Sequence, residues 1–144
     1  MKIEEGLLQR RSPAEAHLNG PFWRRSVWMR LGALNGLVAF SFLLLSDQPL
    51  FLPGNSGLMR QAAQVQFMHG MATLACATFM NAGAVGARLA PGFFLSGVGL
   101  YCLPVYAEAI GLLGPAFAIK QIGLVAFVLG WLILAWSTWD IDKT

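Results

Sequence analysis

Residues 122–136 read IGLVAFVLGWLILAW, a stretch that contains no charged side chain. A helix that crosses the hydrocarbon of a bilayer needs roughly 20 mostly apolar residues, and the apolar character here extends over about 117–136. Pro115 precedes the stretch and a polar tail, 140–144, follows it. The segment therefore predicts a membrane-spanning helix, and it indicates that the chain is an integral membrane protein.

Three further apolar stretches precede this one, at about 28–46, 65–86 and 92–112. The turn-forming residues PGNSG, 53–57, separate the first two, because proline and glycine end helices and favour turns. Pro104 lies inside the third stretch and predicts a kink there. The sequence therefore predicts an all-α fold, an integral membrane four-helix bundle with spans at 28–46, 65–86, 92–112 and 117–136.

The composition excludes a water-soluble domain. Hydrophobic residues make up 56% of the 144 residues and charged residues 12%, whereas about a quarter of an ordinary soluble chain is charged. From residue 31 to residue 139 the only charged side chains are Asp47, Arg60, Arg88, Glu108 and Lys120. The other basic residues gather mainly before the first span, where they would face an anionic leaflet. Because no basic groove or stacking platform accompanies them, nucleic acid is not expected as a partner.

The positions of lysine and arginine predict the orientation of the spans. With four spans, one side of the membrane receives Lys2, Arg10, Arg11, Arg24, Arg25, Arg30, Arg88 and Lys143. The other side receives only Arg60 and Lys120. Since lysine and arginine accumulate in cytoplasmic flanks, both termini are predicted to be cytoplasmic. The chain then comprises a flexible cytoplasmic arm, 1–22, a four-span domain, 23–139, and a cytoplasmic tail, 140–144.

Small residues indicate how the spans pack. Lipid tails are as apolar as leucine, so helices in a membrane associate through close contact at small residues and through a few hydrogen bonds. Three spans carry small residues one turn apart, Gly32 with Gly36, Gly92 with Ser96, and Ala126 with Gly130. Asn35 and Asn81 both fall in the cytoplasmic half of their spans, and a hydrogen bond between them is predicted.

Three ionisable residues inside the spans, His69, Glu108 and Lys120, are the candidate functional groups, because burial of such residues in a membrane is costly. The predicted topology places all three near the outer ends of their spans, with Gln66 and Gln121 nearby. One interpretation is a polar pocket, open to the outer face, for a small ligand, a quinone head group or a proton. The other is structural: Glu108 and Lys120 pair across the turn between them, and a neighbouring carbonyl binds the histidine.

Motifs for catalysis and for metal binding are missing from the sequence. It contains no HExxH, no G-x-S-x-G and no glycine-rich phosphate loop. Met68, Met71 and Cys76 are soft ligands of the kind that Cu(I) favours, but no second span repeats them. We therefore predict no catalytic residue, no metal site, no cofactor and no enzymatic activity.

Several short motifs occur in a characteristic order. They are Gln66-Phe67-Met68-His69, Ser96-Gly97 followed by Leu100-Tyr101, Leu113-Gly114-Pro115, and Gly130-Trp131. Together they resemble the domain-of-unknown-function 423 family of small membrane proteins over roughly residues 31–136. Val65 stands where that family has tyrosine, and SDQP at 46–49 replaces a segment that carries a second histidine. The resemblance implies a multi-pass protein of the bacterial inner membrane, or of an organelle of bacterial descent, and it brings no established reaction.

The predicted function is that of a non-catalytic accessory or assembly subunit of a membrane complex. Its expected partners are the lipid bilayer and a membrane protein, or a second copy of the chain in a homo-oligomer. Two alternatives stay open. The first is a small transporter or permeation unit, which needs a polar path at mid-depth, and the second is a quinone-binding redox protein that uses His69, Glu108 and Lys120.

Overall fold

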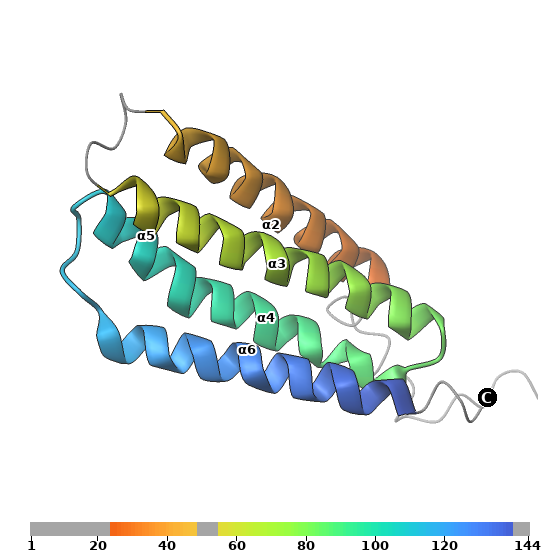
Figure 1. Ribbon diagram of the computed structural model, residues 1–144. Helices are drawn as coiled ribbons and strands as arrows, with labels where there is room; N and C mark the ends of the chain where they lie inside the picture. The colour runs from red at the N-terminus through yellow and green to blue at the C-terminus, as the bar shows by residue number, and fades with distance from the viewer. Residues whose placement is uncertain (1–23, 49–54, 140–144) are drawn as a thin grey trace, which may run out of the picture.

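The computed structural model describes residues 24–48 and 55–139, and every regular element within these ranges is a helix. In chain order they are α2 (Arg25–Ser46), α3 (Ser56–Asn81), the 3-10 helix η2 (Val85–Arg88), α4 (Ala90–Gly97), the π-helix η3 (Val98–Cys102), α5 (Leu103–Ala109) and α6 (Phe117–Ser137). The elements from η2 to α5 follow one another along one rod. The described chain thus forms antiparallel rods that lie side by side, which confirms the all-α class (Figure 1).

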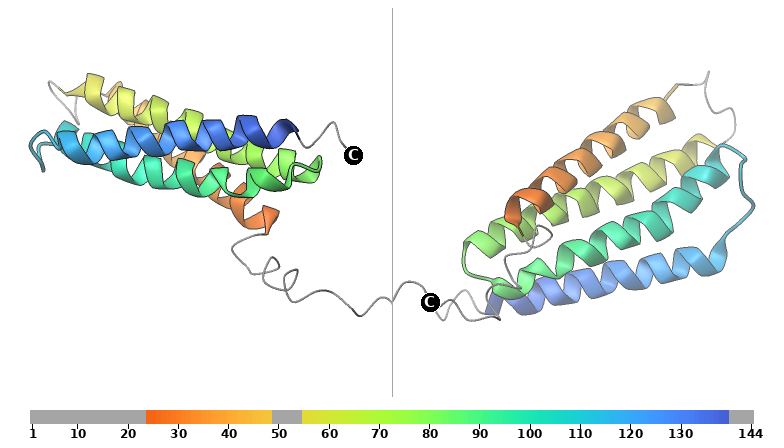
Figure 2. Two further views of the ribbon diagram at one scale, coloured as in Figure 1. Left: turned by 90° about the horizontal axis from the view of Figure 1, so that it is seen from below. Right: turned by 180° about the vertical axis from the view of Figure 1, so that it is seen from behind.

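Helix α3 is the central rod. It packs against α2 on one side and against η2, α4, η3 and α5 on the other, while α6 packs mainly against α4, η3 and η2. The extensive contacts of α2 are all with α3. The right-hand view of Figure 2 shows the same order from behind, with α2 and α6 on opposite flanks. The two peripheral rods therefore present most of their surface outward.

Three helical stretches of the described chain are long and apolar enough to cross a membrane: Arg25–Ser46, Val85–Ala109 and Phe117–Ser137. Helix α3 is longer than any of them, at 26 residues, but it is more polar. Its polar side chains Gln66 and Thr73 are buried, as polar residues in a membrane bundle prefer to be. The lower hydropathy of α3 thus follows from its central position.

The second span was predicted at 65–86, but α3 begins at Ser56 and ends at Asn81. The polar residues that precede position 65 are part of the helix because other rods supply their partners. Arg60 forms an ion pair with Asp47, which directly follows α2, and Gln61 Nε2 donates a hydrogen bond to the hydroxyl of a tyrosine in η3. The helix start therefore depends on contacts that are remote in sequence.

The third span was predicted at 92–112, but its rod runs from η2 to the end of α5 at Ala109. It ends before Gly111, whose φ of 75° lies in the left-handed region that favours glycine. A kink was predicted at Pro104; next to this residue the structure has η3, a π-helical segment that immediately precedes α5. Proline lacks a backbone N–H and its ring crowds the preceding turn, which accounts for the local change in helical register.

The two outer predictions need little adjustment. The first helix begins at Arg25, three residues before the predicted start at 28, and α6 ends one residue after the predicted end at 136. The predicted arm, 1–22, and tail, 140–144, lie outside the described residues.

Candidate functional site

A hydrogen-bonded cluster of polar side chains surrounds Gln66, which is 5% exposed. Gln66 Nε2 donates to Asn35 Oδ1 at 2.9 Å, and the Tyr106 hydroxyl donates to Gln66 Oε1 at 2.7 Å. Asn35 Nδ2 in turn donates to the backbone carbonyl of Gln66 at 3.3 Å. This cluster joins α2, α3 and α5, and each side chain in it is a hydrogen-bond partner of another.

A second polar group lies where α5 ends and α6 begins. Lys120 Nζ is 2.8 Å from one carboxylate oxygen of Glu108 and 2.9 Å from the other. The Ala116 backbone N–H donates to Glu108 Oε1 at 2.8 Å. The side chains of Lys120 and Glu108 are 20% and 11% exposed. The ion pair therefore links α5 to α6 across the loop that connects them.

His69 occupies a third, aromatic environment. Its Nδ1 lies 2.7 Å from the backbone carbonyl oxygen of Val65, and because a carbonyl only accepts, Nδ1 carries the proton. The imidazole stacks on Phe127 of α6, with ring centroids 3.6 Å apart and an interplanar angle of 19°. Phe94 and Trp131 border it at centroid distances of 5.6 and 6.3 Å. The ring thus bridges α3 and α6, two rods that have few backbone contacts.

The five residues predicted to share a polar pocket fall into these separate environments. Glu108 and Lys120 contact each other, whereas Gln66 and His69 each have other partners, and Gln121 is exposed on α6. The common depth assumed for them does not hold. Since α3 begins at Ser56, His69 lies about 20 Å along that helix, near its middle, while the ion pair lies at the bundle end.

The predicted hydrogen bond between Asn35 and Asn81 is wrong. Asn35 bonds to Gln66, and Asn81 Oδ1 accepts a hydrogen bond from Arg25. Antiparallel pairing explains the difference. With Arg25 opposite Asn81, a residue ten positions further along α2 lies about 15 Å away from that asparagine.

Small residues occur at the closest helix contacts. A Cβ on Gly32 would lie 3.1 Å from the Gly70 carbonyl oxygen, and a Cβ on Gly70 would lie 3.2 Å from the backbone N of Gly36. On the other flank, a Cβ on Gly130 would lie 2.6 Å from the Phe94 ring. One turn earlier on α6, Ala126 is also buried. These residues therefore lie between helices of this chain and do not face outward.

Sequence reasoning missed Phe127, which completes the aromatic environment, and it did not identify Tyr106 as the residue that completes the polar cluster. Tyr106 also lies against Phe42 of α2, with ring centroids 4.4 Å apart. An aromatic residue in an apolar span carries no local sign of its partner. The available signal was the helical spacing that puts Gln66 and His69 three residues apart on the inner side of α3.

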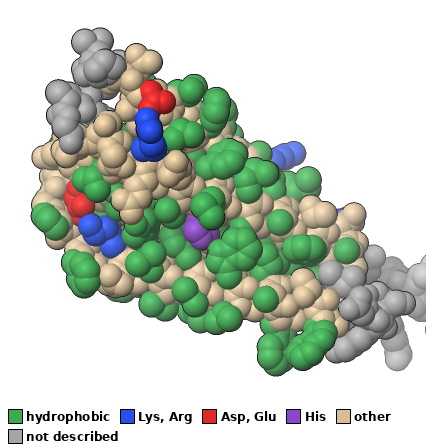
Figure 3. Space-filling view, in the orientation of Figure 1, with side chains coloured by type: hydrophobic (Ala, Val, Ile, Leu, Met, Phe, Trp, Pro, Cys, Tyr) green, Lys and Arg blue, Asp and Glu red, His purple; other side chains and the backbone are tan. Residues whose placement is uncertain are grey.

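Charge is distributed unequally between the two ends of the described bundle. At one end Asp47 pairs with Arg60 and Glu108 pairs with Lys120, and Figure 3 shows both pairs toward the same end of the molecule. At the opposite end lie Arg24, Arg25, Arg30 and Arg88. No acidic residue accompanies these arginines within 24–48 and 55–139. We call this end, defined by the four arginines, the basic end.

Removal of one charge of the Glu108–Lys120 ion pair is expected to destabilise the protein more than removal of both charges. Glu108→Gln leaves the Lys120 ammonium in a poorly hydrated site without its counter-charge, whereas Glu108→Gln with Lys120→Gln leaves no charge there. The unfolding temperature in detergent should fall for the single variant and recover partly in the double variant. Asp47→Asn, in the exposed pair with Arg60, is the control and should change little. Equal losses for the single and double variants would contradict this interpretation.

Among residues 24–48 and 55–139, no three histidine, cysteine or acidic side chains converge on a possible metal position.

Comparison of the chain with protein-family models, curated proteins and solved structures finds no match.

Proposed function

We propose that this chain is a four-span integral membrane protein, with both termini in the cytoplasm, that acts as an accessory or assembly subunit of a larger membrane complex. The observation that carries the proposal is the contrast between the interior and the flanks. The interior polar side chains of α3 and α5 bond to other parts of the same chain, while α2 and α6 present apolar faces outward. Such a bundle is suited to contact lipid and other membrane helices.

The proposal includes α3 as a fourth span. Helix α3 lies between α2 and the η2–α5 rod, both of which are apolar enough to cross a membrane. Its 26 residues extend about 39 Å, more than the roughly 30 Å of hydrocarbon. A helix that is antiparallel to two spanning neighbours, and packed between them, is expected to cross with them.

The basic end supports the proposed orientation. Arginine and lysine accumulate on cytoplasmic flanks, and anionic lipids attract them there. At the opposite end every described cation is paired with an acid, so the positive charge of the described bundle is concentrated at one end. The order of motifs shared with the domain-of-unknown-function 423 family supports a bacterial inner membrane as the location.

The partner is expected to dock on α2, the least enclosed apolar rod. In its most apolar window 17% of residues are buried, compared with 28% for α6 and 50% for the η2–α5 rod. Leu37 is 62% exposed near the middle of this outward face. A bulky substitution there should disturb a docked helix without altering the interior of the bundle.

Affinity purification of the full chain in a mild detergent tests the proposal. We expect a membrane protein, identified by mass spectrometry, to co-purify in stoichiometric amount with the wild type. It should be lost from Leu37→Trp and kept by Leu129→Trp, which places the same change on the exposed face of α6. A monodisperse, partnerless wild-type protein would count against an accessory role.

A second candidate function, binding of a small hydrogen-bond donor such as a hydroquinone, is favoured by one observation. With Nδ1 bonded to Val65, the other imidazole nitrogen of His69 accepts no hydrogen bond from any described residue. The histidine is visible at the surface among hydrophobic side chains (Figure 3). Organic extraction of the purified protein should then release a quinone from the wild type and none from His69→Phe. Equal extracts from both proteins would exclude this function.

A further inference from the structure

The second imidazole nitrogen of His69, Nε2, is an acceptor that has no partner and can be reached from outside the bundle. Because Nδ1 donates to the Val65 carbonyl, Nε2 carries no proton. The other interactions of this side chain are ring contacts. Among the described residues, the buried side-chain nitrogen that lacks a partner belongs to Trp28, so Nε2 is not enclosed. The histidine is only 8% exposed, and its free acceptor therefore faces outward through a narrow opening.

The depth of His69 excludes water and lipid head groups as partners of this atom. The residue lies about 20 Å from the start of α3 at Ser56 and about 18 Å from its end at Asn81. Half of the hydrocarbon layer is only about 15 Å thick, so in the proposed span the imidazole lies near the midplane. An acceptor without a donor is costly in such a medium, because hydrocarbon forms no hydrogen bonds. The donor must therefore come from a molecule within the membrane.

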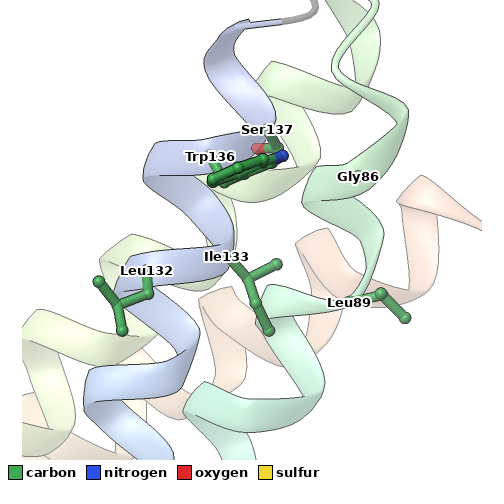
Figure 4. A pocket seen from close by; sticks show the side chains of 6 residues that line it. All are labelled: Gly86, Leu89, Leu132, Ile133, Trp136 and Ser137. Atoms are coloured by element: carbon green, nitrogen blue, oxygen red, sulfur yellow. The ribbon is translucent and has the colours of Figure 1, made fainter.

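A recess between η2 and α6 shows the contrast with a surface that selects nothing (Figure 4). It has a volume of about 360 Å³, and its lining residues are Gly86, Leu89, Leu132, Ile133, Trp136 and Ser137. The only polar side chain in this lining, that of Ser137, already donates to the Leu134 carbonyl at 2.7 Å. Any apolar chain suits the recess, whereas the acceptor on His69 requires a donor.

A second copy of the chain does not supply that donor. In a symmetric dimer that buries this surface, the same patch of both copies meets across the interface. The two His69 side chains then lie opposite each other at the same depth. Both Nε2 atoms are acceptors, and two acceptors cannot form a hydrogen bond.

The surroundings of the imidazole favour a side chain from a helix over a second ring. One face of the imidazole stacks on Phe127, and Phe94 and Trp131 border it at interplanar angles of 52° and 64°. Access is left to the edge that carries Nε2, which lies among hydrophobic side chains (Figure 3). Met68 and Trp131 are 60% and 47% exposed beside it. We call the surface formed by His69, Met68 and Trp131 the histidine face.

We propose that the histidine face docks a membrane-spanning helix of the partner protein, and that a serine, threonine, asparagine or glutamine of this helix donates a hydrogen bond to His69 Nε2. These side chains are the ones that form hydrogen bonds between helices in membranes. The inference rests on the four-span insertion and the accessory role proposed above. It adds to the contact expected on α2 a second contact, and it names the chemistry by which the partner is recognised.

Photo-crosslinking of the full chain in intact cells tests the site. Trp131 is replaced by p-benzoylphenylalanine, and the cross-linked peptide is identified by mass spectrometry. It should come from a membrane-spanning segment of another protein, with one of the four donor residues near its middle. Leu129, which is 41% exposed and points to the other side of α6, is the control position and should not give this peptide. Cross-links from position 131 to lipid alone, or to a second copy of the chain, would overturn the proposal.

His69→Phe tests whether the acceptor contributes to docking. Phenylalanine keeps a ring beside Phe127 but removes Nε2, so the cross-link from position 131 should weaken about three- to fifteenfold, as expected for the loss of one hydrogen bond between membrane helices. Met68→Leu changes the apolar rim alone and should keep the cross-link. An undiminished cross-link in His69→Phe would overturn the proposed bond. If this variant does not fold, the peptide that is cross-linked to the chain with His69 still decides the proposal.

The outcomes also separate this site from the accessory role. A partner that co-purifies with the wild type but does not cross-link from position 131 contradicts only the histidine face. Absence of a partner from both experiments contradicts the accessory role as well. A quinone that is released from the wild type and not from His69→Phe would assign the acceptor to a hydroquinone and would overturn the docked helix.

Discussion

Gly123→Ala is expected to lower the unfolding temperature of the detergent-solubilised protein by several degrees. A Cβ at this position would lie 2.7 Å from the Tyr101 backbone N, 2.8 Å from Tyr101 Cβ and 3.0 Å from the Leu100 carbonyl carbon. Two of these three atoms are backbone, so rotation of a side chain cannot relieve the contact, and α6 has to move away from η3. Overpacking of this kind costs about 1–3 kcal/mol in free energy of unfolding.

Gly92→Ala in α4 is the control for this variant. No atom lies within 4 Å of a Cβ at Gly92, so the added methyl group meets open space. Alanine is favoured over glycine inside a helix by up to about 1 kcal/mol, and this variant should therefore be unchanged or slightly more stable. The two substitutions are chemically the same, but only Gly123→Ala should lower the stability of the protein. A Gly123→Ala protein as stable as Gly92→Ala would show that α6 and η3 do not pack as closely as described.

Gln66→Leu is expected to destabilise the bundle by about 2 kcal/mol, because it leaves two interior groups without partners. The Tyr106 hydroxyl loses its acceptor and Asn35 Oδ1 loses its donor, while the volume at position 66 changes little. Hydrogen bonds between membrane helices are individually modest, at about 0.6–1.7 kcal/mol, so the loss of both should be measurable. The measurement is unfolding by heat or by SDS titration in mixed micelles.

A paired variant tests whether the cost comes from the hydrogen bonds. Tyr106→Phe added to Gln66→Leu removes the unpaired hydroxyl, so part of the lost stability should return. Gln121→Leu, on the exposed face of α6, is the matched single control and should have little effect. If Gln66→Leu resembles Gln121→Leu, or if the double variant is no better than the single one, Gln66 does not organise the interior.

The sequence predicts the helices best where a helix is peripheral. The limits of α2 and α6 differ from the predicted limits by three residues or fewer, because lipid-facing helices must be apolar along their whole length and their ends coincide with changes in composition. The start predicted for the central helix, α3, was nine residues too late. Its polar first turns are helical because Asp47 and Tyr101 bind them, and both partners come from other rods.

The candidate site was less predictable, for a related physical reason. The pairing of Glu108 with Lys120 was open as an interpretation because the two residues flank a single short turn. The surroundings of His69 depend instead on the relative depth of α3 and α6, which follows from where each helix begins. The prediction started α3 too late in the chain and therefore put the histidine near the end of the bundle, far from Phe127 and Phe94. In the structure these two rings lie next to it.

Thiol labelling in intact cells tests most directly whether α3 crosses the membrane, as the four-span architecture requires. Cysteine is introduced singly at Gln48, Val85 or Leu113, which are exposed at the ends of the rods, in a chain whose buried Cys76 and Cys102 are replaced by alanine. A membrane-impermeant maleimide should label Gln48→Cys and Leu113→Cys from outside, and Val85→Cys only after permeabilisation. Labelling of Gln48→Cys and Val85→Cys from the same side would show that α3 does not cross, and it would contradict the four-span architecture.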